Sequence, residues 1–538
     1  MEKGLGVQEL SGNISLLYKD GIHPVSSDGL SEEDSEQLEL YELIDLHGSG
    51  FGSFFTTDID TILYRQRMFA DLSENPGLTQ VLLKMTPFLS DITELRRMSS
   101  QSAAVGDAYL YSISEVEIYV SLMDLLRDEL LPYRDKVSSP AFCAFIERIS
   151  RLTESDYYKN LTEKMSELAS RVRDIKSVTI GVNLDSRLSP SSAGVLSVNS
   201  EPFKSGDFFE KVMRLDFKKD DMTCIAELIP FRKGQSENQQ LALTNAFNAG
   251  ISEVFKSSVR SWKKAVSYYV VENTDFLLRM APEIEFVTKG AELIEKLRAR
   301  GCPLCTPTIR PMDEKKFNCR SLCNPVIAMK TNAPLVPNDF AFDDRGMIYV
   351  ITGPNRGGKS VITCAVGHAF AMAQSGLPVC AQSAELSPCD RILTHFPTGS
   401  EDTVEKGRLG EECSRLCHMF DNVTKYSLVL LDESLSSTGS FEGAYIAGEV
   451  LSGFSMAGCR GIFSTHLHDL AASVDKINGE CVPNGGSPVD NMVAQVEDGS
   501  RTFRIIRRSP DGKSYARDIA DKYGLSLDKI LDKISKRS

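Results

Sequence analysis

The chain has 538 residues, of which 42% are hydrophobic and 25% are charged, and its formal net charge at pH 7 is −14. This length and balance exclude a single small domain and a disordered chain, because one hydrophobic core rarely supports so many residues and the apolar content is that of folded proteins. The negative charge argues against coating nucleic acid, and no stretch approaches the ~20 apolar residues that span a membrane, so we expect a cytoplasmic protein with no membrane partner.

Three regions follow one another along the chain. Residues 1–40 combine glycine, serine and acidic residues with few large apolar groups, which predicts a flexible leader. Across 41–310 apolar residues such as Ile62 and Phe69 recur at helical spacing and predict a mainly helical domain. Alternating β-branched residues interrupt this pattern and predict a small β element near 176–235.

From residue 311 to 538, short apolar strands alternate with helices, the order typical of an α/β domain with a largely parallel sheet. A strand predicted at 347–352 runs into a glycine-rich loop and then a helix, which is the setting of a phosphate-binding loop. Its glycines let N–H groups surround phosphate oxygens, and the helix N-terminus adds a favourable dipole. The predicted nucleotide-binding residues are Gly353, Pro354, Asn355, Arg356, Gly357, Gly358, Lys359, Ser360 and Val361.

Catalytic roles follow from the same pattern. Lys359 is expected to reach the β- and γ-phosphates, and the Ser360 hydroxyl to hold Mg²⁺. A second apolar strand ends in Asp432, predicted to bind the same Mg²⁺, and in Glu433, predicted to orient or deprotonate the attacking water. His466 follows a third strand and is a candidate sensor of the γ-phosphate. The nucleotide expected is ATP, because no Asn-Lys-x-Asp motif for reading guanine is found.

Four segments, taken in order, carry a family resemblance: Thr352–Ser360, Ser427–Glu433, Ser464–His466 and Gly512–Ala516. Together they resemble the MutS family of DNA-associated ATPases, an ABC-like branch of the P-loop proteins. The resemblance implies an α/β P-loop NTPase domain over 311–538, preceded by a helical core and lever domain. It also implies Mg²⁺-dependent ATP hydrolysis in a homodimer, with nucleotide sites at the dimer interface driving helical arms on DNA. Such a protein would serve repair or recombination rather than mismatch recognition.

The chain also departs from the family pattern. Because the core segment begins near residue 45, we expect no mismatch-recognition and connector domains. We also expect no C-terminal Smr domain. Leu409 and Gly410 stand where the family has hydroxyl residues that contact the partner's γ-phosphate. The alternative function is therefore an ATP-gated interaction protein with slow turnover that acts on a protein partner. The segment 323–327 resembles a family strand and is predicted to be one.

Two further groups of residues each allow two interpretations, one as a binding site and one as ordinary structure. Cys302, Cys305, Cys319 and Cys323 have a spacing close to that of a zinc site, and buried free thiols are the alternative. Basic residues near the β element and on the following helix could contact a DNA backbone, and a solvated helix face is the alternative. These residues are Arg232, Lys233, Lys256, Arg260, Lys263 and Lys264.

Overall fold

The computed structural model divides the chain into two units, called here unit 1 (Met1–Ile14, Asn75–Ser138 and Phe142–Ile284) and unit 2 (Ser15–Glu74, Ser139–Ala141 and Glu285–Ser538). The larger part of unit 1 is therefore inserted into the sequence of unit 2. The structure describes residues 14–21, 29–46, 50–101, 105–156, 158–163, 177–186, 190–199, 201, 226–228, 274–331, 334–397, 407–497, 500–509, 525 and 529–530. Among the described helices, none combines the length and apolar character needed to cross a bilayer.

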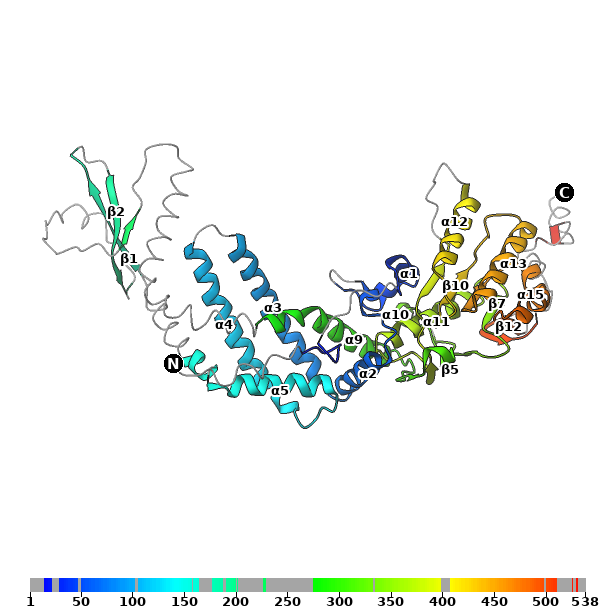
Figure 1. Cartoon of the computed structure of the whole chain (residues 1–538), viewed down its shortest axis with the longest axis horizontal. Coiled ribbons are helices and arrows are strands. Elements are labelled where there is room, and N and C mark those ends of the chain that lie inside the picture. Colours follow the sequence, from blue (N-terminus) through cyan, green and yellow to red (C-terminus); the bar gives the residue numbers. More distant parts are fainter. Residues whose placement is uncertain are drawn as a thin grey trace. The chain divides into compact units, whose positions relative to one another are not determined.

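Two long helices dominate unit 1. Helix α3 (Pro76–Gln101) and helix α4 (Val105–Glu129) lie side by side (Figure 1). Their apolar residues recur at helical spacing and are buried between them, as the sequence pattern predicts. Arg96 of α3 donates to Glu115 of α4 at 2.8 Å and also pairs with Asp275. This ion-pair cluster ties the two helices to the later part of the unit.

The rest of unit 1 contains short elements and a small sheet. The 3₁₀ helix η4 (Leu131–Tyr133) precedes α5 (Pro140–Glu154), which buries an aromatic and aliphatic stripe. The predicted β element contains an antiparallel sheet in the order β1 (Ser177–Leu184), β2 (Pro190–Asn199), β3 (Ala226–Leu228). The basic residues considered for DNA contact, at 232–264, lie outside the described residues. Helix α9 (Ala281–Ala299) then leads into unit 2.

Unit 2 is built on a six-stranded sheet whose strands are parallel except for β13. The strand order is β13 (Ser500–Arg507), β12 (Val489–Glu497), β7 (Ile348–Thr352), β11 (Arg460–Ser464), β10 (Leu428–Asp432) and β9 (Ile392–His395). Strands β7, β10 and β11 are buried at every position, which explains their continuous apolar runs. The three strands predicted around the candidate site match these three.

Helices cover both faces of this sheet. Helix α11 (Lys359–Gln374) packs against β10 and β11. Residues of β7, β10 and β11 share a buried apolar cluster with four helices. These helices are α12 (Gly407–Asn422), α13 (Ser440–Ala457), α14 (His468–Ala472) and α15 (Val474–Cys481), and the 3₁₀ helix η6 (Val482–Asn484) follows them.

A second, four-stranded sheet has the order β4 (Thr308–Ile309), β8 (Ser383–Leu386), β5 (Phe317–Leu322), β6 (Asn338–Phe342), and η5 (Met312–Glu314) lies between β4 and β5. The prediction of a strand at 323–327 is wrong, because helix α10 (Pro325–Lys330) begins there. Asn324 caps this helix by accepting the Ile327 N–H at 3.0 Å, and Pro325 occupies its first turn.

The chain from residue 29 to 46 seals the edge of the six-stranded sheet. It forms α1 (Glu32–Gln37) and η2 (Leu40–Glu42), and it precedes η3 (Phe51–Phe54) and α2 (Ile59–Glu74). Three N–H groups along and just beyond β9 donate to it: Ile392 N–H to Gly29 O at 2.9 Å, Thr394 N–H to Asp34 Oδ1 at 2.7 Å, and Phe396 N–H to Gln37 Oε1 at 2.9 Å. Part of the predicted leader is thus built into unit 2.

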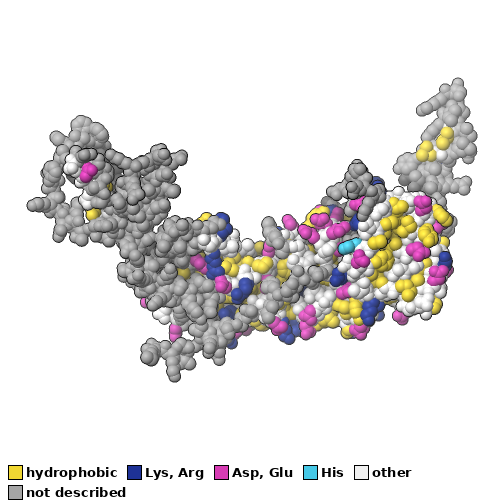
Figure 2. All heavy atoms as spheres, turned by 45° about the horizontal axis from the view of Figure 1, so that its top comes forward, with side chains coloured by type: hydrophobic (Ala, Val, Ile, Leu, Met, Phe, Trp, Pro, Cys, Tyr) yellow, Lys and Arg dark blue, Asp and Glu magenta, His cyan; other side chains and the backbone are white. Residues whose placement is uncertain are grey.

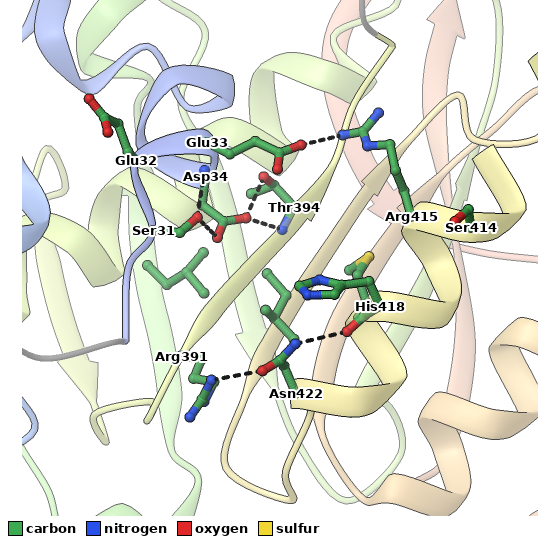
Figure 3. Close-up of a pocket in the computed structure, with 13 residues that line it drawn as sticks. Ser31, Glu32, Glu33, Asp34, Arg391, Thr394, Ser414, Arg415, His418 and Asn422 are labelled. Atoms are coloured by element: carbon green, nitrogen blue, oxygen red, sulfur yellow. Dashed lines mark hydrogen bonds and ion pairs between the residues drawn. The ribbon is translucent and has the colours of Figure 1, made fainter. Parts of the chain in front are cut away.

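A cavity of about 670 Å³ opens between α1, β9 and α12 (Figure 3). Several of its charged and polar side chains pair with one another. Arg415 of α12 contacts Glu33 of α1 at 3.1 Å, and Arg391 donates to Asn422 at 3.2 Å. The cavity therefore marks where α12 is fastened to the N-terminal segment.

We predict that Asp34→Ala lowers the free energy of unfolding by about 1–3 kcal/mol, because it leaves the buried Thr394 N–H without its acceptor. Urea unfolding followed by circular dichroism measures this change. The matched control is Glu36→Ala on the same helix, an exposed position expected to change stability by less than about 0.5 kcal/mol. Equal effects of the two substitutions would contradict the proposed sealing role of Asp34.

Candidate functional site

The loop between β7 and α11 approaches its neighbours too closely for side chains. Gly353 and Gly358 have φ angles of 141° and 96°, which favour glycine. A Cβ on Gly353 would lie 2.7 Å from the Ala494 Cβ, and a Cβ on Gly357 would lie 2.8 Å from the Pro354 carbonyl oxygen. The loop therefore has the form of a cradle for an anion at the N-terminus of α11.

The cationic group of the site lies inside this loop. Lys359 is only 3% exposed, and its ammonium donates to the carbonyls of Gly353 (3.1 Å) and Pro354 (3.3 Å). Its Nζ also lies 3.3 Å from His466 Nε2. Burial lowers the pKa of Lys359, and the nearby Glu433 carboxylate opposes this effect. The ammonium is thus placed beside the cradle and only partly compensated by protein groups.

The chemistry of Ser360 and Asp432 fits a magnesium ion. Asp432 ends β10, and the Ser360 hydroxyl hydrogen-bonds to its side chain. Among the described residues, Asp432 Oδ1 has no hydrogen-bond partner although it is buried. Burial raises the pKa of Asp432 to about 6, with the Ser360 hydrogen bond opposing it. A buried carboxylate oxygen in need of a partner, next to a hydroxyl, is a donor set that a hard cation prefers.

Glu433 and His466 form a hydrogen-bonded pair. Glu433 follows β10 with a φ of 50°, and its N–H donates to the Ser464 carbonyl at 2.8 Å. His466 Nε2 lies 2.9 Å from Glu433 Oε1. Burial and the Lys359 charge lower the pKa of His466, so we assign a neutral ring that donates to Glu433 from Nε2. Both side chains are partly exposed, so water can reach the carboxylate.

Sequence reasoning missed a polar contact beneath this group. Thr363 Oγ1 lies 2.6 Å from Ser464 Oγ and also contacts the Lys359 carbonyl at 3.1 Å. It joins helix α11 to strand β11. Thr363 stands four residues after Lys359, so helical spacing could have indicated that both lie on the same side of α11.

The other predicted nucleotide-binding residues lie at the rim. Asn355 and Arg356 are exposed, and Arg356 has a φ of 58°. Val361 is 40% exposed, and its carbonyl accepts from Asn324 Nδ2 at 3.1 Å. The structure therefore gathers Lys359 with the carboxylates at the strand ends, and it leaves these three side chains beside the loop.

The position expected to contact a partner subunit lies in the first turn of α12. Leu409 packs against the apolar cluster beneath the sheet, and Gly410 follows it on the surface. The residues at 398–406, just before this turn, lie outside the described residues. Leu409 thus contributes to packing within its own subunit.

The four cysteines considered for zinc have free thiols. Burial raises the pKa of Cys305 and of Cys323 to about 11, and it raises that of Cys319 further. The Cys302 thiol is hydrogen-bonded to that of Cys380, which lowers its pKa. In the part of the chain that the structure describes, no group of three or more His, Cys, Asp or Glu side chains is arranged to hold a metal ion.

Comparison with known families gives two matches. The model described as MutS domain V matches residues 349–532, and the MutS2 N-terminal domain matches residues 57–300. The two matches cover most of the chain, and the domain V match includes the glycine-rich loop, Lys359, Ser360, Asp432, Glu433 and His466. The chain belongs to the MutS family.

Individual MutS relatives resemble only part of the chain. Endonuclease MutS2 of Thermus thermophilus is 34% identical over 198 residues, which is 36% of this chain and 25% of the relative. DNA mismatch repair protein MutS of Chlorobium chlorochromatii is 33% identical over 199 residues, 36% of this chain and 22% of the relative. The DNA mismatch repair protein MutS of Thermosipho melanesiensis is 31% identical over 215 residues, which is 38% of this chain and 25% of the relative. The aligned region spans about a quarter of each of these relatives.

We predict that Gly353→Ala lowers the free energy of unfolding by about 1–3 kcal/mol, because the new Cβ meets Ala494 and the φ of 141° is strained for alanine. The matched control is Gly479→Ala in α15, where a Cβ meets nothing within 4 Å. That substitution should stabilise the protein by about 0.5–1 kcal/mol. Denaturant unfolding of both variants tests the difference in sign.

Proposed function

We propose that the chain is an ABC-like P-loop ATPase that binds ATP at the loop 353–360 and hydrolyses it. The observation that supports this most strongly is the gathering of one ammonium, two carboxylates and one imidazole around a glycine cradle. In this proposal Lys359 neutralises the β- and γ-phosphate charge. Asp432 and Ser360 would hold Mg²⁺, which when bound would neutralise charge on the phosphate oxygens.

In this proposal the hydrolytic step depends on the pair Glu433 and His466. Glu433 would accept a hydrogen bond from water and orient it for attack on the γ-phosphate. His466 would hold the Glu433 carboxylate in place through the 2.9 Å contact. A neutral Nε2 serves one neighbour at a time, either as donor to Glu433 or as acceptor from Lys359. The ring can therefore respond when Lys359 turns from the loop carbonyls towards phosphate.

We further propose a homodimer that acts on DNA through the helical unit. The support for the DNA role is family membership and the names of its relatives, which include an endonuclease and mismatch repair proteins. For the dimer, Figure 2 shows hydrophobic side chains gathered on one face of unit 2. Phe441 and Tyr445, one turn apart on α13, are 82% and 67% exposed. Helix α13 begins directly after the loop that carries Glu433, so a second copy on this face would lie beside the site.

One observation favours the second candidate function, an ATP-gated interaction protein with slow turnover. Leu409 is packed into its own subunit where the family has a hydroxyl residue for the partner's γ-phosphate. Without that contact, ATP would still bind and close the dimer, but the transition state would be less stabilised. The protein would then act mainly as a switch that holds a protein partner.

Substitution of the water-orienting carboxylate separates the two candidates. We predict that Glu433→Gln retains ATP and favours the dimer, and that it lowers turnover by about 100-fold or more. Steady-state phosphate release with and without DNA measures the effect, and Glu314→Gln, an exposed position on η5, is the control. If the wild type hydrolyses ATP no faster than Glu433→Gln, the proposed ATPase function is contradicted. Absence of band shifts on branched, mismatched and plain duplexes at low salt contradicts the DNA role.

We also predict a pH dependence of Mg²⁺ use that arises from Asp432. Its pKa of about 6 lies above the usual value, so the carboxylate is charged at pH 7.5 and mostly protonated at pH 5.5. The advantage of wild type over Asp432→Asn in Mg²⁺-dependent nucleotide binding should therefore shrink by about fourfold at pH 5.5. Fluorescent-nucleotide titrations at both pH values test this. A constant ratio of the two affinities would argue against Asp432 as a magnesium ligand.

A further inference from the structure

The loop after β10 has a backbone that its own residues do not favour. Glu433 has a φ of 50° and Leu435 a φ of 62°, both in the left-handed region. Neither residue is glycine, so the surroundings must hold this conformation. Leu435 is fully buried, so its N–H needs an acceptor within the protein. The same loop carries Glu433, whose carboxylate is proposed above to orient the attacking water.

That acceptor comes from helix α12. The Leu435 N–H donates to Glu412 Oε2 at 2.7 Å. Between the two strained residues, Ser434 Oγ lies 2.7 Å from His395 Nδ1 and donates to the His395 carbonyl at 3.1 Å. Burial lowers the pKa of His395 to about 4, so the ring is neutral and can donate from Nδ1 to the hydroxyl. The loop is thus held at two successive residues.

Helix α12 is itself fixed on several sides. Leu409 and Cys413 pack into the apolar cluster, while Arg415 reaches the other way to Glu33 of α1, as Figure 3 shows. The loop is also confined from α13, because a Cβ on Gly443 would lie 2.9 Å from the Leu435 carbonyl oxygen. The carboxylate of Glu412 is therefore presented from an anchored helix to a loop with little room to move.

We propose that Glu412 is a positioning residue for Glu433, acting through its hydrogen bond to the Leu435 N–H. The proposal rests on the ATPase function proposed above. Removing the acceptor leaves a buried N–H unsatisfied, and the backbone from 433 to 435 can then relax out of the left-handed region. The Glu433 carboxylate would then lose the orientation in which it binds the attacking water, while the glycine cradle and Lys359 stay in place.

The position of Glu412 also links two parts of the site. Glu412 lies in the second turn of α12, after Leu409 and Gly410. A change at the first turn of the helix would therefore reach the Leu435 N–H through this carboxylate. Glu412 is thus the contact through which the first turn of α12 can influence the aim of Glu433 in the same subunit.

The test compares Glu412→Ala, which removes the acceptor, with Glu412→Gln, which keeps an amide oxygen at the same length. We expect Glu412→Ala to lower kcat by on the order of 10- to 100-fold. Its nucleotide Kd should stay within about twofold of wild type, since the cradle is untouched. Glu412→Gln should restore most of the rate. Asp421→Ala, an exposed position on the same helix, is the control and should behave as wild type.

Amide hydrogen exchange of the full-length protein without nucleotide provides a readout that does not depend on turnover. Exchange at Leu435 should quicken by about tenfold or more in Glu412→Ala and remain slow in Glu412→Gln. Unchanged exchange in Glu412→Ala, or a rate loss in Glu412→Gln as large as in Glu412→Ala, would overturn the positioning role. If the wild type does not hydrolyse ATP, the proposed ATPase function is contradicted instead. Hydrogen exchange at Leu435 then still tests whether Glu412 holds the loop.

Discussion

The site depends on the register of three parallel strands. Asp432 at the end of β10 is paired with Ser464 of β11, and Ser464 is paired with Ile351 of β7. Because parallel strands end at one edge of a sheet, this register brings the loop after each strand to the same place. The glycine cradle follows β7, the two carboxylates end and follow β10, and His466 follows β11. The contacts of His466 with Glu433 and with Lys359 are consequences of that alignment.

The sheet can hold this alignment because it is buried on both faces. In β10, alternate side chains point to the cluster shared with α12 to α15 and to α11. Burial of each such apolar side chain contributes about 1.5–3 kcal/mol. The strand ends are the places where this apolar packing stops and polar groups can be held. Burial at these strand ends also lowers the pKa values of Lys359 and of the half-buried His466, and it raises that of Asp432.

The sequence predicted the part of the site that follows local rules. Glycine spacing, a preceding apolar run and a following helix identify the cradle, and carboxylates or histidine after apolar runs identify the strand ends. Contacts between distant segments carry no such signal. Glu412 and Leu435 are 23 residues apart, and nothing in either segment indicates that a glutamate accepts from a backbone N–H. The error at 323–327 has a local cause, because Asn324 and Pro325 form a helix start that was read as strand.

The N-terminal segment bears on how the ATPase unit can be isolated. Residues 29–46 lie before the stretch that matches the MutS2 N-terminal domain and far from the stretch that matches domain V, yet they supply the acceptors for the edge of β9. An uncovered edge strand offers unpaired N–H groups to any neighbouring chain. A fragment cut at the family boundaries would therefore expose a site for intermolecular strand pairing and tend to aggregate, even with every residue of the nucleotide site present.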